Sequence, residues 1–203
     1  DGTVTQLKDP ATLQTTTIEG LRSVKCYGSS MAFKATLEKV YGVHGVKVFV
    51  KRHSADILYD PTKTTVEKIQ EAIYKPSKFR VKTPDPEALD SLKVVTIRTE
   101  GMYDKLDINY LGMKMRQAEK GIFGLETEFA CPLIVRVYMD PAEDLSEDWF
   151  EEIVEMEVLQ MPQHGGGVKE IECGYDFVKM EDEVSYISVE DHIRNMFSPF
   201  KAE

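Results

Sequence analysis

In the first part of the chain, apolar residues recur first with the spacing of one face of a helix and then alternate with polar residues as in a strand. A helical stripe runs from Phe33 through Leu37 to Tyr41, and Gly42 would end the helix. Alternate apolar residues predict a strand from Val46 to Val50. Further strands are predicted at 21–24, 57–59 and 79–81. A second helix would begin with a capping box of Thr64 and Glu67. Its buried face would consist of Val66, Ile69 and Ile73. The predicted order is βαββαβ.

The same order of elements returns further along the chain. The Gly-x-x-Gly turns that begin at Gly42 and Gly121 lie 79 residues apart, and the Asp-Pro pairs at Asp60 and Asp140 lie 80 apart. A fixed separation of this kind indicates a duplicated unit. The second copy has predicted strands at 92–97 and 133–139, a helix with Ile108, Leu111, Met115 and Ala118 on one face, and a helix capped by Ser146 that buries Phe150, Ile153, Val154 and Val158.

Residues 160–203 exceed the repeat. Gly165, Gly166 and Gly167 predict a turn between two strands, and residues 189–197 a short helix. Between the copies, residues 83–86 read Thr-Pro-Asp-Pro, which is typical of a linker. We therefore expect domains at 1–83 and 90–203.

Composition and charge exclude some classes of protein and of partner. The 203 residues are 42% hydrophobic and 30% charged, which is typical of a folded chain, and the net charge of −10 argues against nucleic acid as a partner. The apolar run from Phe129 to Met139 is too short to span a bilayer and is interrupted by Arg136, so no transmembrane segment is expected. The chain begins with Asp1, from which we expect a removed leader, and a periplasmic or cell-envelope location ahead of a cytoplasmic one.

The first repeat resembles the heavy-metal-associated domain of copper chaperones, mercury-binding periplasmic proteins and metal-pumping ATPases. The residues that carry the likeness are the run from Val24 to Ser29, Gly42-Val43, Tyr59-Asp60-Pro61 and the Ile69 to Ile73 segment. The likeness covers residues 18–81 and, more weakly, 92–160. It implies an α+β fold of tandem ferredoxin-like βαββαβ units with antiparallel sheets, the second unit bearing a C-terminal β-rich extension.

The resemblance also implies where a metal would bind. The family's Met-x-Cys-x-x-Cys loop corresponds here to Cys26-Tyr27-Gly28-Ser29, with Val24 at the methionine position. The second thiolate is therefore replaced by a serine, and a hydroxyl is a poor ligand for a soft ion such as Cu(I). Two chains that each offer Cys26 would restore two thiolates, so we expect either binding across a homodimer or a site that has lost its metal.

Two further positions follow from the same alignment. Phe79 corresponds to the residue that lies beside the family's metal, although it would fit a core position equally well. In the second copy Asp104 and Asp107 stand where the cysteines would be, and carboxylates suit hard cations or helix caps.

The remaining candidate ligands have simpler explanations. Cys131 and Cys173 lie in strand-like segments and are expected to be small buried residues, while His44 and His53 are expected in solvent. A loose set of soft side chains near the C-terminus, Met156, Met161, His164 and Cys173, is a second copper candidate with irregular spacing.

No catalytic motif is present: the sequence has no Gly-x-Ser-x-Gly, phosphate-binding Gly-rich loop, His-Glu-x-x-His or Cys-x-x-Cys. We therefore expect a non-enzymatic protein that binds or relays a soft metal ion through Cys26, Cu(I) ahead of Hg(II) or Zn(II), with a second copy or another metal-handling protein as partner. The alternatives are an interaction module that binds no metal, and thiol redox chemistry at the Cys-x-x-Ser loop.

Overall fold

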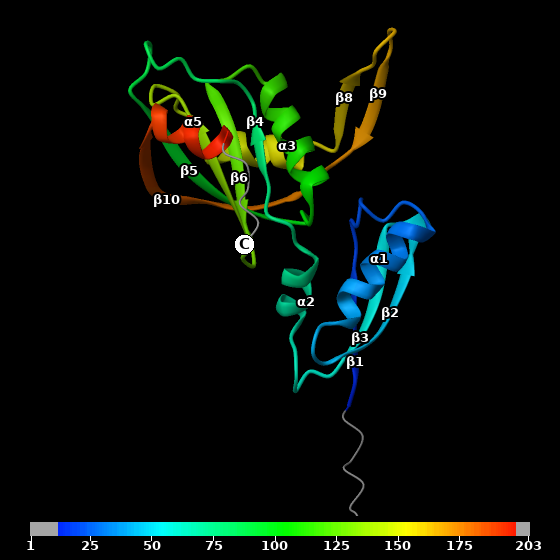
Figure 1. Cartoon of the computed structure of the whole chain (residues 1–203). Helices are drawn as coiled ribbons and strands as arrows, with labels where there is room; N and C mark the ends of the chain where they lie inside the picture. The colour runs from blue at the N-terminus through cyan, green and yellow to red at the C-terminus, as the bar shows by residue number, and fades with distance from the viewer. Residues whose placement is uncertain (1–11, 198–203) are drawn as a thin grey trace, which may run out of the picture. The chain divides into compact units, whose positions relative to one another are not determined.

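The computed structural model describes residues 12–197, which form two compact units that divide between Tyr74 and Lys75 (Figure 1). Within that range lie five α-helices and ten strands, and every strand pair is antiparallel. The α+β class with ferredoxin-like units is confirmed. The division falls earlier than the linker at 83–86 that the sequence suggested.

The first unit is a three-stranded sheet with two helices. Its strands lie in the order β1-β3-β2. The elements are β1 (Gln14–Ile18), α1 (Tyr27–Glu38), β2 (Val43–Phe49), a 3-10 turn (Val50–Arg52), β3 (Ser54–Tyr59) and α2 (Val66–Ile73).

The first strand was predicted in the wrong place. Leu21 and Val24 lie in a turn after β1, and both are almost fully buried. The backbone N–H of Leu21 donates to the carbonyl of His53 at 2.8 Å, which holds this turn against the start of β3. The strand itself is the polar run from Gln14 to Ile18, whose threonines suit a half-exposed edge.

Two smaller predictions in this unit were also wrong. Thr65, whose hydroxyl accepts from the N–H of Lys68, caps α2, so the cap is not the predicted box of Thr64 and Glu67. Tyr41 lies past the end of α1 with 74% of its surface exposed, so the buried stripe ends before it.

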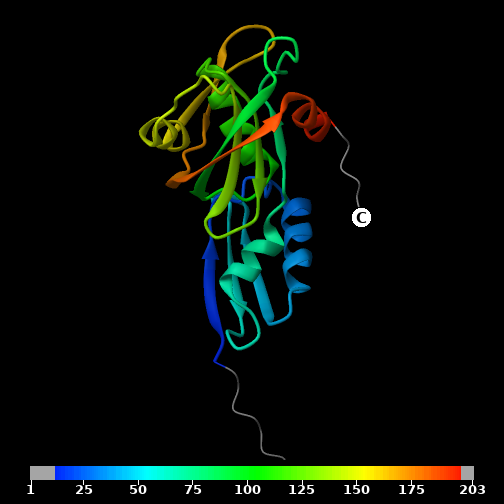
Figure 2. The same cartoon turned by 90° about the vertical axis from the view of Figure 1, so that its left-hand side faces the viewer.

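The second unit has a five-stranded sheet in the order β10-β5-β7-β6-β4 (Figure 2). Strands β10, β5, β7 and β6 with α3 and α4 form a ferredoxin-like unit, and the β8–β9 hairpin is inserted between α4 and β10. The elements are β4 (Lys78–Arg80), β5 (Ser91–Glu100), α3 (Lys105–Gln117), β6 (Ile122–Glu128), β7 (Leu133–Met139), α4 (Glu147–Glu155), β8 (Val158–Pro162), β9 (Val168–Glu172), β10 (Asp176–Ser188) and α5 (Val189–Phe197).

Strand β4 was predicted to close the first sheet but belongs to the second. Its three residues pair with β6, Phe79 opposite Leu125. The ring of Phe79 packs on α3 at Gly112, where a Cβ atom would lie only 2.0 Å from the ring. Pairing with β6 and packing on α3 therefore hold this strand in the second unit.

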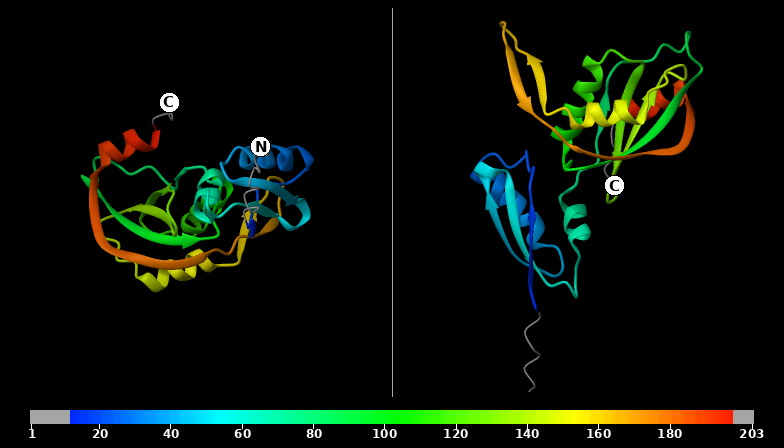
Figure 3. Two further views of the ribbon diagram at one scale, coloured as in Figure 1. Left: turned by 90° about the horizontal axis from the view of Figure 1, so that it is seen from below. Right: turned by 180° about the vertical axis from the view of Figure 1, so that it is seen from behind.

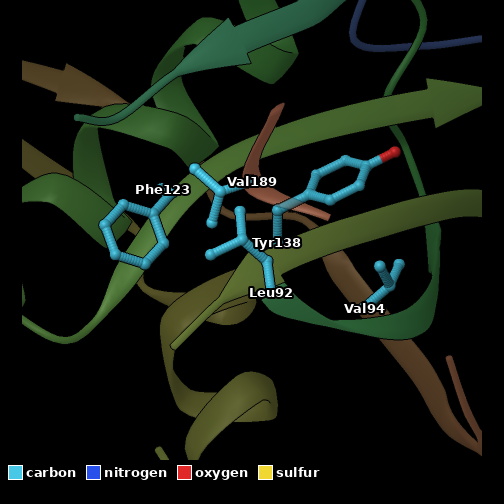
Figure 4. Packing of buried hydrophobic residues seen from close by; sticks show 5 residues of the cluster. All are labelled: Leu92, Val94, Phe123, Tyr138 and Val189. Carbon is cyan, nitrogen blue, oxygen red and sulfur yellow. The ribbon is translucent and has the colours of Figure 1, made fainter. Parts of the chain in front are cut away.

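One core cluster of the second unit joins the sheet to α5. Leu92, Val94, Phe123 and Tyr138 pack with Val189 of α5 (Figure 4). Val95 and Ile97 point to the opposite face because side chains alternate along β5. This second face is left for α3 and α4, so that helices cover both faces of the sheet (Figure 3, left). Val158, which was predicted to face inward from α4, instead begins β8 and is 38% exposed.

Candidate metal centre

Cys26 is the residue that caps the N-terminus of α1. Its backbone is extended, with φ −151° and ψ 176°, and the helix begins at Tyr27. The thiol is exposed and is not part of a disulfide. A cap residue lies next to the backbone N–H groups that the first turn leaves unpaired, so a negative charge on its side chain is favoured there.

Ser29 completes a capping box with Cys26. Its hydroxyl accepts hydrogen bonds from the N–H groups of Lys25 at 2.8 Å and Cys26 at 3.0 Å, and it donates to the carbonyl of Cys26. The same hydroxyl lies 3.5 Å from the Cys26 sulfur. Ser29, which stands at the position where the resemblance would put a second cysteine, is therefore engaged in shaping the loop.

These contacts make Cys26 more acidic. The largest contribution is that of the Ser29 hydroxyl, followed by the backbone N–H of Ser29. With a lesser one from the N–H of Gly28, they lower the pKa of the Cys26 thiol below its usual value, although desolvation opposes them. A lower pKa raises the thiolate fraction near neutral pH, and the thiolate is the form that binds metal or reacts.

The rest of the loop is open. Tyr27 is 79% exposed, and Met31 one turn further along α1 is 45% exposed. A Cβ at Gly28 would meet nothing nearer than the Cys26 sulfur at 3.9 Å. Large apolar side chains in solvent beside an exposed thiol are suited to contact with another molecule.

Sequence reasoning missed a link between this loop and the β2–β3 turn. The imidazole Nδ1 of His53 lies 3.0 Å from the carbonyl of Val24. A carbonyl only accepts, so Nδ1 carries the proton. The exposed His53 follows two cations, Lys51 and Arg52, and the hydrogen bond brings this cationic turn to the end of the unit that bears Cys26.

In the second unit the structure uses the two aspartates as helix caps. Asp104 caps α3 by accepting from the N–H of Leu106, and Asp107 accepts from the N–H groups of Tyr103 and Asp104 and from the hydroxyl of Tyr175. Asp107 is fully buried, and burial raises its pKa despite these hydrogen bonds. The pair repeats the N-cap and N3 arrangement of Cys26 and Ser29. Because both carboxylates are engaged in this way, nothing favours a metal role for them.

The other predicted ligands are not brought together. Phe79 belongs to β4 of the second unit, where it packs on α3, so its expected place beside the metal loop has no support. Cys131 is exposed, contrary to its predicted burial, because it lies in the bend that precedes β7; Cys173 is buried as expected. Among residues 12–197 no group of three or more His, Cys, Asp or Glu side chains could hold a metal ion, and no helix is long and apolar enough to cross a membrane.

The donor set at Cys26 fits a soft ion in part. A thiolate is a suitable ligand for such ions, and the exposed loop leaves room for one to approach. One sulfur from one chain is half of a two-coordinate site, so a soft ion bound there would need a second ligand from elsewhere.

Comparison with known proteins identifies a family for most of the first unit. The model of the heavy-metal-associated domain family matches residues 17–79, from the end of β1 into β4. It matches once, so a second copy stays a prediction. No curated protein matches the chain.

Two solved structures are similar to parts of the chain. Oxidized MerP from Ralstonia metallidurans CH34 is 30% identical over 30% of this chain and 83% of its own length, with a TM-score of 0.29. The N-terminal soluble domains of Bacillus subtilis CopA are 18% identical over 84% of this chain and 95% of their own length, with a TM-score of 0.30. The family model thus identifies residues 17–79 of this chain as a heavy-metal-associated domain, and this match supports a metal-binding or metal-handling role.

Proposed function

We propose that this protein is a non-enzymatic binder or carrier of a soft metal ion, with Cys26 as its ligand. The observation that carries the proposal is the exposed thiol at the N-cap of α1, whose pKa the loop lowers, inside a heavy-metal-associated domain. Cu(I) is the first candidate ion, ahead of Hg(II) and Zn(II). Two-coordinate sulfur ligation suits the soft ions Cu(I) and Hg(II), whereas Zn(II) takes four ligands.

The second ligand would come from another molecule. A second copy of this chain, or another metal-handling protein, would supply a thiolate to the ion held by Cys26. Ser29 is not proposed as a ligand, because its hydroxyl is engaged with the backbone of Lys25 and Cys26. Half an ion per chain with formation of a dimer is the expected stoichiometry.

The test is an anaerobic titration of the reduced protein with Cu(I) against a competing chelator, with the mass measured in the same samples. Cys26→Ser should abolish competitive binding and leave the fold intact. Cys131→Ser is a matched control, because Cys131 is also exposed but lies in the second unit. Equal binding by Cys26→Ser and the unaltered chain would overturn the assignment.

A second function, as a protein-interaction module that binds no metal, is favoured by the exposure of Tyr27 beside Cys26. Thiol redox chemistry is the third interpretation of the same loop. No competitive Cu(I) binding by the unaltered chain would favour the interaction module. Slow labelling of Cys26 below neutral pH would remove the redox interpretation, because that chemistry needs a thiolate there.

A further inference from the structure

The two units carry opposite net charges. Residues 1–74 contain ten Lys and Arg and eight Asp and Glu, a formal charge of +2, whereas residues 75–203 contain 15 and 27, a formal charge of −12. The chain's net charge of −10 hides this asymmetry. Opposite potentials on two parts of one chain favour contact between unlike parts of different copies.

The positive charge of the first unit gathers at the end that bears Cys26. Segments 20–30 and 44–53 carry five Lys and Arg and no Asp or Glu. The hydrogen bonds of Leu21 and Val24 with His53 hold these segments together. We call Lys25, Lys51 and Arg52, all exposed, the basic rim. The Arg52 guanidinium stacks 3.9 Å from the centre of the Phe49 ring, which limits its movement.

Much of the negative charge of the second unit lies on one side of helix α4 and on the neighbouring part of β10. Helix α4 buries Phe150, Ile153 and Val154, and its opposite side carries only carboxylates. The N–H groups of Phe177 and Met180 donate to Glu155 and Glu147, which places β10 beside this helix (Figure 3, right). We call the following exposed residues the acidic face: Glu147, Asp148, Glu151, Glu152, Glu155, Asp182 and Glu183.

Cations close to this face are already engaged. Arg98 binds Glu181 at 2.9 Å, and Lys179 lies 3.4 Å from the same carboxylate. Glu181 holds both cations beside itself and balances one of the two charges, while Asp182 and Glu183 next to it stay exposed. The seven exposed carboxylates of the acidic face outnumber these two cations, so the face keeps a net negative charge.

We propose that the basic rim of one copy docks on the acidic face of a second copy, in a head-to-tail contact. The apolar side chains available to centre such a contact are Tyr27 next to the rim and Met156 at the end of α4, which are 79% and 38% exposed. Exposed charge pairs contribute about 1 kcal/mol or less each, so the contact is weak and sensitive to salt. It needs no metal, and because it joins unlike surfaces it can extend beyond two copies.

The effect of salt distinguishes this contact from a metal-bridged dimer. A dimer that shares one ion between two Cys26 thiolates brings two basic rims together, so screening of their repulsion by salt would strengthen it. The head-to-tail contact joins opposite charges, so salt would weaken it. The two associations therefore respond to salt in opposite directions, and either can fail without the other.

The experiment uses the full, reduced, metal-free chain in sedimentation at about 20 mM and about 500 mM NaCl, which span weak and strong screening. One variant reverses the rim (Lys51→Glu with Arg52→Glu), and another reverses the face (Glu151→Lys with Glu152→Lys). The unaltered chain should exceed its monomer mass of 23.1 kDa at low salt only. Each variant alone should associate at least about tenfold more weakly than the unaltered chain.

An equimolar mixture of the two variants is the decisive sample. It offers an unaltered rim on one chain and an unaltered face on the other, so association should return at low salt. The Cys26→Ser chain should associate like the unaltered one. A mixture that stays monomeric while the unaltered chain associates would overturn the proposal, and so would an unaltered chain that is monomeric at low salt.

Discussion

The Ser29 hydroxyl lies 3.5 Å from the sulfur of Cys26, one turn into the helix that Cys26 caps. A hydroxyl has a single proton, which here can be donated either to the Cys26 carbonyl or to the sulfur. Once the thiol ionises, the sulfur becomes the stronger acceptor. Ser29 therefore favours the thiolate form of Cys26.

Ser29→Ala should make Cys26 less reactive. Loss of the hydroxyl removes the largest cause of the lowered pKa, so the thiolate fraction at neutral pH should fall. The rate of iodoacetamide labelling, followed by mass spectrometry against pH, measures this directly. Cys131 in the same sample is the internal control, because its labelling profile should not move. Loss of the capping box should also cost the first unit about 1 kcal/mol of stability. An unchanged pH profile at Cys26 would show that the helix backbone alone sets its acidity.

His192 should make the second unit sensitive to acid. Burial lowers the pKa of His192 from 6.5 to about 4, opposed by the charge of Glu126 and assisted by that of Lys78. Its ring lies 4.7 Å from that of Tyr138, and Nδ1 has no hydrogen-bond partner within the described part of the chain. As pH falls from 6.5 to about 4, the unfolded chain binds a proton that the native state does not, so up to about 3 kcal/mol of stability is lost.

Urea unfolding, followed through the single tryptophan, Trp149, reports on the second unit alone. His192→Leu should flatten the dependence of stability on pH in this window, whereas His164→Leu, at an exposed position of the same unit, should leave it unchanged. Equal slopes for the two variants would mean that carboxylates, not His192, cause the loss.

Gly112→Ala should destabilise the second unit although alanine favours a helix. The new Cβ would lie 2.0 Å from the Phe79 ring, so β4 must move or the helix must shift. Because the clash is severe, we expect a cost near the upper end of the about 1–3 kcal/mol typical of overpacking, which exceeds the roughly 1 kcal/mol gained in helix propensity. Adding Phe79→Ala removes the clash, so the two substitutions should be less costly together than their sum. Gly28→Ala in α1, with no contact nearer than 3.9 Å, is the control and should not destabilise the chain.

Lys114→Met should destabilise the second unit without touching the first. The buried Lys114 ammonium donates to the carbonyls of Val154 at 3.0 Å, Met156 at 2.7 Å and Cys173 at 2.7 Å. It thereby joins the end of α4 to the segment that leads into β10. Methionine fills similar space but leaves these acceptors without the ammonium, at a cost of about 3 kcal/mol or more. Lys105→Met, at an exposed position of the same helix, should cost little. Similar unfolding midpoints for both variants would contradict this role for Lys114.

Local sequence signals were sufficient to predict a helix or strand where its apolar residues follow a regular spacing. Helix α5 has the predicted bounds of 189–197, and Ser146 caps α4 as expected. The loop that holds Cys26 was also found in the sequence, because it directly precedes the apolar helical stripe of α1, although the strand before it was predicted in the wrong place. These features depend on residues a few positions apart, and so a single stretch of sequence contains them.

Other features depended on residues far apart in the chain. Burial of Asp107 requires Tyr175, 68 positions away, and the link of the Cys26 loop to the β2–β3 turn requires His53, 29 positions from Val24. The sequence by itself determined the α+β class, the order of most elements and the single thiol of the loop. Only the tertiary structure decided that β4 joins the second sheet, because Phe79 finds its place against Gly112, 33 positions away, and no local pattern encodes that contact.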